Sequence, residues 1–133
     1  MAHDIFISHT SKDKAVADIV CTALEATGIR CWIAPRDIQP GKGWVESIVE
    51  AVRASKIVVL LFSESANQSK DVVNEITLAV NLNIMVLPVS IGDTRPSATL
   101  EYYLTSVYWL ELTNPSDKMQ INKIVKHTKA LIK

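Results

Sequence analysis

The sequence predicts an α/β protein in which helices cover both faces of a parallel β-sheet. Short apolar segments alternate along the chain with segments of about 10 to 15 residues whose apolar side chains recur at helical spacing. One apolar run, 56–62, shows no polar alternation, which is typical of a central parallel strand buried on both faces. Strands that alternate with helices form parallel sheets of this kind.

The first half of the chain gives three strands and two helices. In order, we expect a strand at 4–8, a helix at 13–27, a strand at 31–33, a helix at 44–54 and a strand at 56–62. The first helix follows from the spacing of Ala17, Val20 and Leu24, and Gly28 is suited to end it.

The second half continues the alternation, with one unclear segment. We expect a helix at 70–82, a strand at 84–89, a strand at 107–110 and a closing helix at 116–132. Ser116 is a suitable N-cap for the closing helix. The segment 95–106 has no clear period and is compatible with a short helix.

Composition limits the possible partners. The chain has 133 residues, of which 48% are apolar and 21% charged, and this composition predicts a single globular domain, 1–133. The alternative that this domain is one part of a longer multidomain chain stays open. The formal net charge is zero, which argues against nucleic acid and anionic membrane surfaces as partners.

The cysteines and the first residues indicate a reducing, cytoplasmic location. Cys21 and Cys31 fall in predicted apolar elements without metal-ligand spacing, so core thiols are expected and no metal site is. Residues 1–4 lack the pattern of a signal peptide, and no apolar run reaches the roughly 20 residues of a membrane span.

Three polar segments are expected at one edge of the sheet. Segment 8–11 follows the first strand, segment 36–41 follows the second, and segment 69–76 opens a helix. In open parallel sheets, ligands bind outside the carboxyl ends of the strands. The sequence therefore predicts a binding site at this edge.

The order of these segments resembles the Toll/interleukin-1 receptor (TIR) domain over nearly the whole chain. The strand 4–8 that ends in Ser8, the loop 36–41 after the second strand (the BB loop of that family), and the segment 55–63 each resemble a family motif, and the run 31–37 is similar to prokaryotic members. The resemblance implies a flavodoxin-like three-layer sandwich with a five-stranded parallel sheet of order 2-1-3-4-5.

The resemblance also implies two possible functions. Some TIR domains are scaffolds that assemble with one another in innate immune signalling. Others cleave the bond between nicotinamide and ribose in NAD+, releasing nicotinamide with ADP-ribose or a cyclic ADP-ribose isomer. NAD+ would then be a substrate, with no cofactor, and activity in an antiviral response would depend on self-assembly with other TIR domains.

Glu75 is the candidate catalytic residue. On a helical wheel it lies between the apolar arc around Val72 and Ile76 and the polar face, where a carboxylate is partly desolvated. A helix-edge glutamate paired with a lysine is the alternative that the wheel leaves open. The resemblance favours catalysis, because TIR NADases carry their essential glutamate at this place on this helix.

One carboxylate suffices for this chemistry. Nicotinamide leaves NAD+ as a neutral molecule and needs no acid, so only the positive charge that develops on the ribose must be stabilised. The resemblance implies substrate contacts from the loop after the first strand, the BB loop and the next helix, namely Ser8, His9, Thr10, Ser11, Arg36, Gln39 and Trp44. Trp44 could instead pack the loop onto the sheet, and Arg36 could instead pair with Asp37.

The rest of the BB loop is expected to mediate self-association, through Asp37, Ile38, Pro40 and Gly41. The alternative function is a non-enzymatic scaffold that acts by TIR–TIR interaction through this loop. The sequence departs from several hydrolytic members at Asp71, where they carry an aromatic residue. A phosphate-binding response-type domain is disfavoured, because Ser8, His9 and Thr10 stand where such domains need an acidic cluster.

Overall fold

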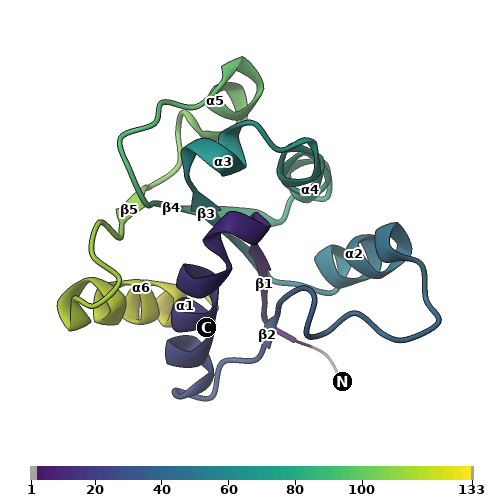
Figure 1. Cartoon of the computed structure of the whole chain (residues 1–133), viewed down its shortest axis with the longest axis horizontal. Helices are drawn as coiled ribbons and strands as arrows, with labels where there is room; N and C mark the ends of the chain where they lie inside the picture. Colours follow the sequence, from purple (N-terminus) through teal and green to yellow (C-terminus); the bar gives the residue numbers. More distant parts are fainter. Residues whose placement is uncertain (1–2, 133) are drawn as a thin grey trace.

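The computed structural model describes residues 3–132 and forms one five-stranded parallel sheet (Figure 1). Its strand order is β2-β1-β3-β4-β5, which confirms the predicted fold class and strand order. The strands are β1 (Ile5–Ser8), β2 (Cys31–Trp32), β3 (Ile57–Phe62), β4 (Met85–Ser90) and β5 (Leu110–Glu111).

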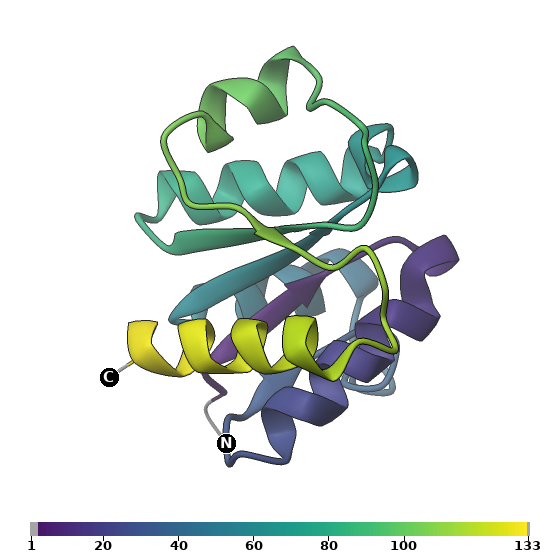
Figure 2. The ribbon, with the colours of Figure 1, turned by 90° about the vertical axis from the view of Figure 1, so that its left-hand side faces the viewer.

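Helices connect the strands and form two layers around the sheet (Figures 1 and 2). They are η1 (Ser11–Asp13), α1 (Lys14–Glu25), α2 (Trp44–Arg53), α3 (Glu64–Asn67), α4 (Lys70–Asn81), α5 (Ala98–Leu104) and α6 (Lys118–Leu131). One buried cluster packs α1 and α6 against the sheet, and a second packs α2, α4 and α5 against its other face.

Alternation along β1 determines which helix layer each of its side chains meets. Ile5 and Ile7 belong to the cluster under α1 and α6, whereas Phe6 belongs to the cluster under α2 and α4. Successive residues of a strand point to opposite faces, so Ser8 shares the face of Phe6. Ser8 is therefore directed towards α4, and it is fully buried.

Most predicted elements are confirmed, but the last strand was placed wrongly. Only Leu110 and Glu111 pair with β4, opposite Val89 and Ser90. The sequence places Trp109 inside the strand, but in the structure its indole N–H donates to the carbonyl of Leu104 at 3.1 Å, and its ring packs edge-on against Phe62. Trp109 thus bonds to the last residue of α5 instead of pairing with β4.

Smaller differences occur at loops and caps. The unclear segment 95–106 contains α5. Asp117, not Ser116, caps α6, since the Asp117 carboxylate accepts from the backbone N–H of Met119 at 2.9 Å. The short elements η1 and α3 were not predicted, because three or four residues are too few to show an apolar period.

Both cysteines are buried in the cluster under α1 and α6, as predicted. Within residues 3–132, none of the helices has the length and hydropathy that a membrane span requires.

Candidate functional site

A cleft of about 540 Å³ lies at the carboxyl ends of β1 and β2, between the first turns of α1, α2 and α4. The side chains around it come from four segments that are far apart in sequence. They are Phe6, Ile7, His9, Thr10, Ser11, Lys14, Ala34, Pro35, Trp44, Ile48, Ser69, Asp71 and Glu75. The predicted edge of the sheet therefore carries a cleft.

Glu75 is a half-buried carboxyl group at the inner side of this cleft. On α4 it stands next to Ile76, which packs fully buried against the sheet, so the backbone holds Glu75 at the border of the core. Its Oε1 accepts a hydrogen bond of 2.7 Å from the Ser8 hydroxyl. A strand end and a helix thus fix the carboxyl group together.

Burial raises the pKa of Glu75 from its usual 4.5 to about 7. The Ser8 hydrogen bond opposes this rise because it stabilises the carboxylate, and the nearby charge of Asp71 adds to the rise. The side chain is therefore a carboxylic acid below neutral pH and a carboxylate above it. Strongly shifted groups of this kind in a cleft are typical of functional sites.

Replacing Ser8 by alanine should move the titration of Glu75 to higher pH. Loss of the hydroxyl removes the one interaction that lowers the pKa of Glu75, so the pKa rises, by about one unit for one lost hydrogen bond. A pH titration of Ser8→Ala, followed by NMR of the Glu75 side chain, measures this shift. Ser8→Thr keeps a hydroxyl and is the control; an unchanged pKa in Ser8→Ala would contradict the assignment.

Ser8 does not line the cleft, so the structure gives it a different place from the predicted substrate contact. It is buried beneath Glu75 because the alternation of β1 directs it to α4. Its placement makes it a positioning residue for the carboxyl group.

His9 connects the two loops that border the cleft. Its Nδ1 lies 2.9 Å from the carbonyl oxygen of Thr10, and its Nε2 lies 3.1 Å from that of Ala34, just after β2. The ring therefore spans from the first loop to the second. His9 lines the cleft as predicted, but its nitrogens are directed at backbone carbonyls.

Thr10 and Ser11 also line the cleft, and they differ in how firmly hydrogen bonds hold their side chains. The Thr10 hydroxyl donates to Asp13 at 3.1 Å and accepts from Ser65 at 3.0 Å, so it is held in place. Ser11 is exposed at the start of η1. The Ser11 side chain can therefore contact a ligand in the cleft.

Trp44 is 53% exposed and opens α2, as predicted. Besides the main cleft, Trp44 and Glu75 also line an adjoining cavity of about 100 Å³ between α2 and α4. The indole and the carboxyl group therefore border the same space. The exposed ring argues against the alternative in which Trp44 only packs the loop onto the sheet.

Arg36 does not reach the cleft. Its guanidinium pairs with Glu25 at 2.9 Å and with Asp37 at 2.9 Å, and it donates to the carbonyl oxygen of Cys31 at 3.0 Å. Asp37 in turn accepts from the backbone N–H of Ile33 at 2.9 Å. The pairing with Asp37 that the sequence left open is therefore the one found.

These contacts protect the edge of the sheet. β2 is an edge strand, and the backbone N–H and C=O groups of its successive residues point alternately towards β1 and away from it. The carbonyl of Cys31 and the N–H of Ile33 lie on the side away from β1, where Arg36 and Asp37 satisfy them. Unpaired groups at sheet edges invite pairing with other chains, so these two side chains cover that edge.

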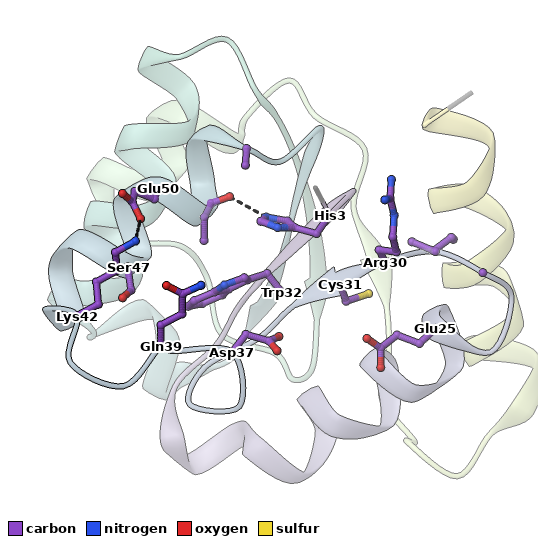
Figure 3. Close-up of a pocket in the computed structure, with 14 residues that line it drawn as sticks. His3, Glu25, Arg30, Cys31, Trp32, Asp37, Gln39, Lys42, Ser47 and Glu50 are labelled. Atoms are coloured by element: carbon purple, nitrogen blue, oxygen red, sulfur yellow. Dashed lines mark hydrogen bonds and ion pairs between the residues drawn. The ribbon is translucent and has the colours of Figure 1, made fainter. Parts of the chain in front are cut away.

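The remainder of the BB loop also lies outside the cleft. Gln39 lines a second cavity, of about 590 Å³, together with residues of β2 and α2 (Figure 3). Pro40 and Gly41 are exposed at the tip, and Gly41 has a φ of 81°, which glycine adopts readily. Ile38 packs against the core under α2 and α4, so it holds the loop instead of projecting from it.

Lys14 and Asp71 also line the cleft, although neither is among the predicted site residues. Lys14, the first residue of α1, lies close to Asp18 and brings a positive charge to the cleft. Asp71 lies one helical turn before Glu75 and is exposed. Since both lie in the first turn of helices that start at the carboxyl edge of the sheet, their place in the topology could have indicated them.

Comparisons with known proteins agree with the fold. A family model described as "TIR domain" matches residues 5–125. The solved TIR domain of the Toll-related receptor TRR-2 from Hydra magnipapillata superposes with a TM-score of 0.78 at 17% identity, over 96% of this chain and 98% of that one.

Two curated relatives match over most of this chain. The stimulator of interferon genes protein of Magallana gigas is 30% identical over 96 residues, which are 68% of this chain and 23% of that protein. The probable 2′ cyclic ADP-D-ribose synthase BdTIR of Brachypodium distachyon is 27% identical over 100 residues, which are 74% of this chain and 44% of that protein. This chain thus spans less than half the length of either relative.

Proposed function

This chain belongs to the TIR domain family, and from that premise we propose that it cleaves the bond between nicotinamide and ribose in NAD+. The observation that carries the proposal is the half-buried carboxyl group of Glu75 in a cleft that Trp44 also lines. The relative BdTIR, named a probable 2′ cyclic ADP-D-ribose synthase, supports chemistry of this class.

Glu75 would act as a carboxylate beside the ribose. As the bond between C1′ and the nicotinamide nitrogen lengthens, its electron pair goes to nitrogen and positive charge develops on the ribose. A desolvated carboxylate stabilises that charge and accepts hydrogen bonds from ribose hydroxyls. Water then attacks C1′ and loses a proton to give ADP-ribose, or a nucleophilic atom of the substrate attacks to give a cyclic isomer.

The other cleft residues suit the remaining parts of NAD+. The exposed Trp44 ring can stack on a base. The charge of Lys14 and the hydroxyl of Ser11 can contact the diphosphate or a ribose. Separation of the ribosyl products by chromatography would distinguish a hydrolase, which yields ADP-ribose, from a cyclase.

Replacing Trp44 by alanine should lower kcat/KM for NAD+ about tenfold or more, chiefly through a higher KM. Stacking of a base on an aromatic ring contributes about 1–3 kcal/mol, and the half-exposed ring contributes little to folding. Steady-state kinetics measure the change. Trp44→Phe keeps a flat ring and should retain most of the affinity; equal losses in the two variants would contradict stacking.

We further propose that the domain acts as an assembly of TIR domains in an immune response. Arg36 and Gln39 lie outside their own cleft, while the loop tip at Pro40 and Gly41 is exposed. An exposed loop can contact a neighbouring copy, in agreement with the resemblance described above. The proposal includes that the domain is of the prokaryotic type and acts in antiviral defence. It also includes that the product is either ADP-ribose or a cyclic isomer of it.

A non-enzymatic scaffold is the second candidate function. The exposed loop tip serves self-association equally well without catalysis. The two functions differ in whether they require Glu75, because a scaffold that assembles through the BB loop does not need a carboxyl group in the cleft. Assembly without release of nicotinamide would favour the scaffold.

A further inference from the structure

Two buried cysteines lie side by side at the base of the BB loop. Cys21 on α1 and Cys31 on β2 are 3% and 6% exposed. Their sulfur atoms and a carboxylate oxygen of Glu25 all lie within 4.8 Å of one another. A disulfide bond between them would bring the two sulfur atoms to about 2.05 Å.

Arg36 shows why this cluster is better suited to thiol chemistry than to a metal. Its guanidinium donates to both carboxylate oxygens of Glu25, at 2.9 and 3.0 Å, and its Nη1 lies 3.7 Å from the sulfur of Cys21. Arg36 already supplies the positive charge that a metal ion would bring. The same charge favours a thiolate at Cys21.

The two thiols are unequal. The pKa of Cys21 is lowered, chiefly by the neighbouring Cys31 thiol and also by the charge of Arg36, although burial and Glu25 act against this. The pKa of Cys31 is raised, because of the neighbouring Cys21 sulfur and because the group is buried. Because Arg36 Nη1 lies 3.7 Å from the sulfur of Cys21, Cys21 is the thiol that can attack an oxidant, and Cys31 is the thiol that can follow.

A small oxidant has a route to the Cys31 side of the pair, and the sulfur of Cys21 lies within 4.8 Å of that of Cys31. Cys31 lines the second cavity, of about 590 Å³, in which its sulfur lies on the side of Glu25 (Figure 3). Hydrogen peroxide is little larger than water, so a cavity of this size admits it.

We propose that Cys21 and Cys31 form a peroxide-sensitive pair that closes to a disulfide at the base of the BB loop. The Cys21 thiolate attacks hydrogen peroxide, which forms an S–O bond, breaks the O–O bond and releases hydroxide. The Cys31 sulfur then attacks the resulting sulfenic acid and loses its proton, which forms the S–S bond and releases water. Overall, two thiols and one peroxide give one disulfide and two waters.

The disulfide would fasten the loop that borders the cleft. Arg36 joins α1 to β2 and to the loop through Glu25, Cys31 and Asp37. A covalent bond between α1 and β2 lies within this set of contacts and limits their separation. The proposal does not depend on NAD+ cleavage, because it concerns residues outside the cleft.

Mass spectrometry of the peroxide-treated chain tests the proposal directly. The chain has two cysteines, and trypsin separates them into peptides 15–30 and 31–36. We expect a monomer lighter by two hydrogen atoms, a linked pair of these peptides, and full recovery of both thiols with a reductant. Unreacted thiols, sulfinic acids or a disulfide between two molecules would each overturn the proposal.

Single substitutions test the order of the two thiols. In Cys31→Ser, which keeps a hydrogen-bond donor beside Cys21, dimedone should trap a sulfenic acid at Cys21. That reaction should be at least about tenfold faster than trapping at Cys31 in Cys21→Ser. Equal rates would contradict the assigned roles. Alanine variants replace any serine variant that does not fold, and the wild-type result stands without them.

Discussion

Replacement of Glu75 by glutamine should lower the rate of nicotinamide release from NAD+ by about a hundredfold to a thousandfold. Groups that stabilise developing charge in a desolvated site are worth about 10²–10³ in kcat, and Glu75 is the carboxyl group that Ser8 fixes in the cleft. Glutamine keeps the shape of the side chain and removes its charge. Single-turnover measurement of nicotinamide at pH 8 gives the rate of the chemical step.

An exposed carboxylate outside the cleft provides the matched control. Glu64 opens α3 on the surface, and Glu64→Gln removes the same charge from the whole molecule. Its rate should equal that of the wild type. A Glu75→Gln variant that retains more than a tenth of the wild-type rate would rule out the assigned role of Glu75.

The same substitution should stabilise the fold at alkaline pH. In the native state the pKa of Glu75 is raised to about 7, whereas in the unfolded chain it returns to about 4.5. Between these values the native state binds the extra proton, so the contribution of Glu75 to stability falls as the pH rises from 4.5 through 7. Above pH 7 the full shift corresponds to a loss of about 3 kcal/mol, which solvent screening of the half-buried side chain reduces to the order of 2 kcal/mol.

Glutamine does not ionise and avoids this cost. The free energy of unfolding of Glu75→Gln should therefore exceed that of the wild type by about 2 kcal/mol at pH 8.5 and match it near pH 4. Chemical denaturation at the two pH values measures the difference, with Glu64→Gln as the control. A variant that is no more stable than the wild type at pH 8.5 would show that Glu75 is not desolvated as described. Higher stability together with lost activity is the combination typical of functional sites.

The sheet and the position of Glu75 could be predicted because both follow from local periodicity. Apolar runs of strand length between amphipathic helices indicate a parallel sheet. The helical wheel around Val72 and Ile76 determines where Glu75 lies relative to the core, whatever the helix packs against. The placement of Trp44 and of the loop 9–11 beside the cleft followed from the rule that sites form at the carboxyl edge.

The parts that could not be predicted depend on contacts between distant residues. Arg36 turns away from the cleft because it meets Glu25, on a helix whose position relative to the loop is set by packing. Ser8 acts on Glu75 instead of facing the cleft, which follows from the side of β1 on which α4 packs. β5 begins later than predicted, since Trp109 bonds to Leu104 at the end of α5.

The most direct test of the account is release of nicotinamide by the wild-type chain itself. Concentrated protein is incubated with NAD+ and a crowding agent, light scattering reports assembly, and chromatography measures nicotinamide. The account predicts release that grows with the assembled fraction and disappears in Glu75→Gln under the same conditions. Assembled wild-type protein that releases no nicotinamide would contradict the proposed cleavage of NAD+ and would leave the TIR scaffold as the function.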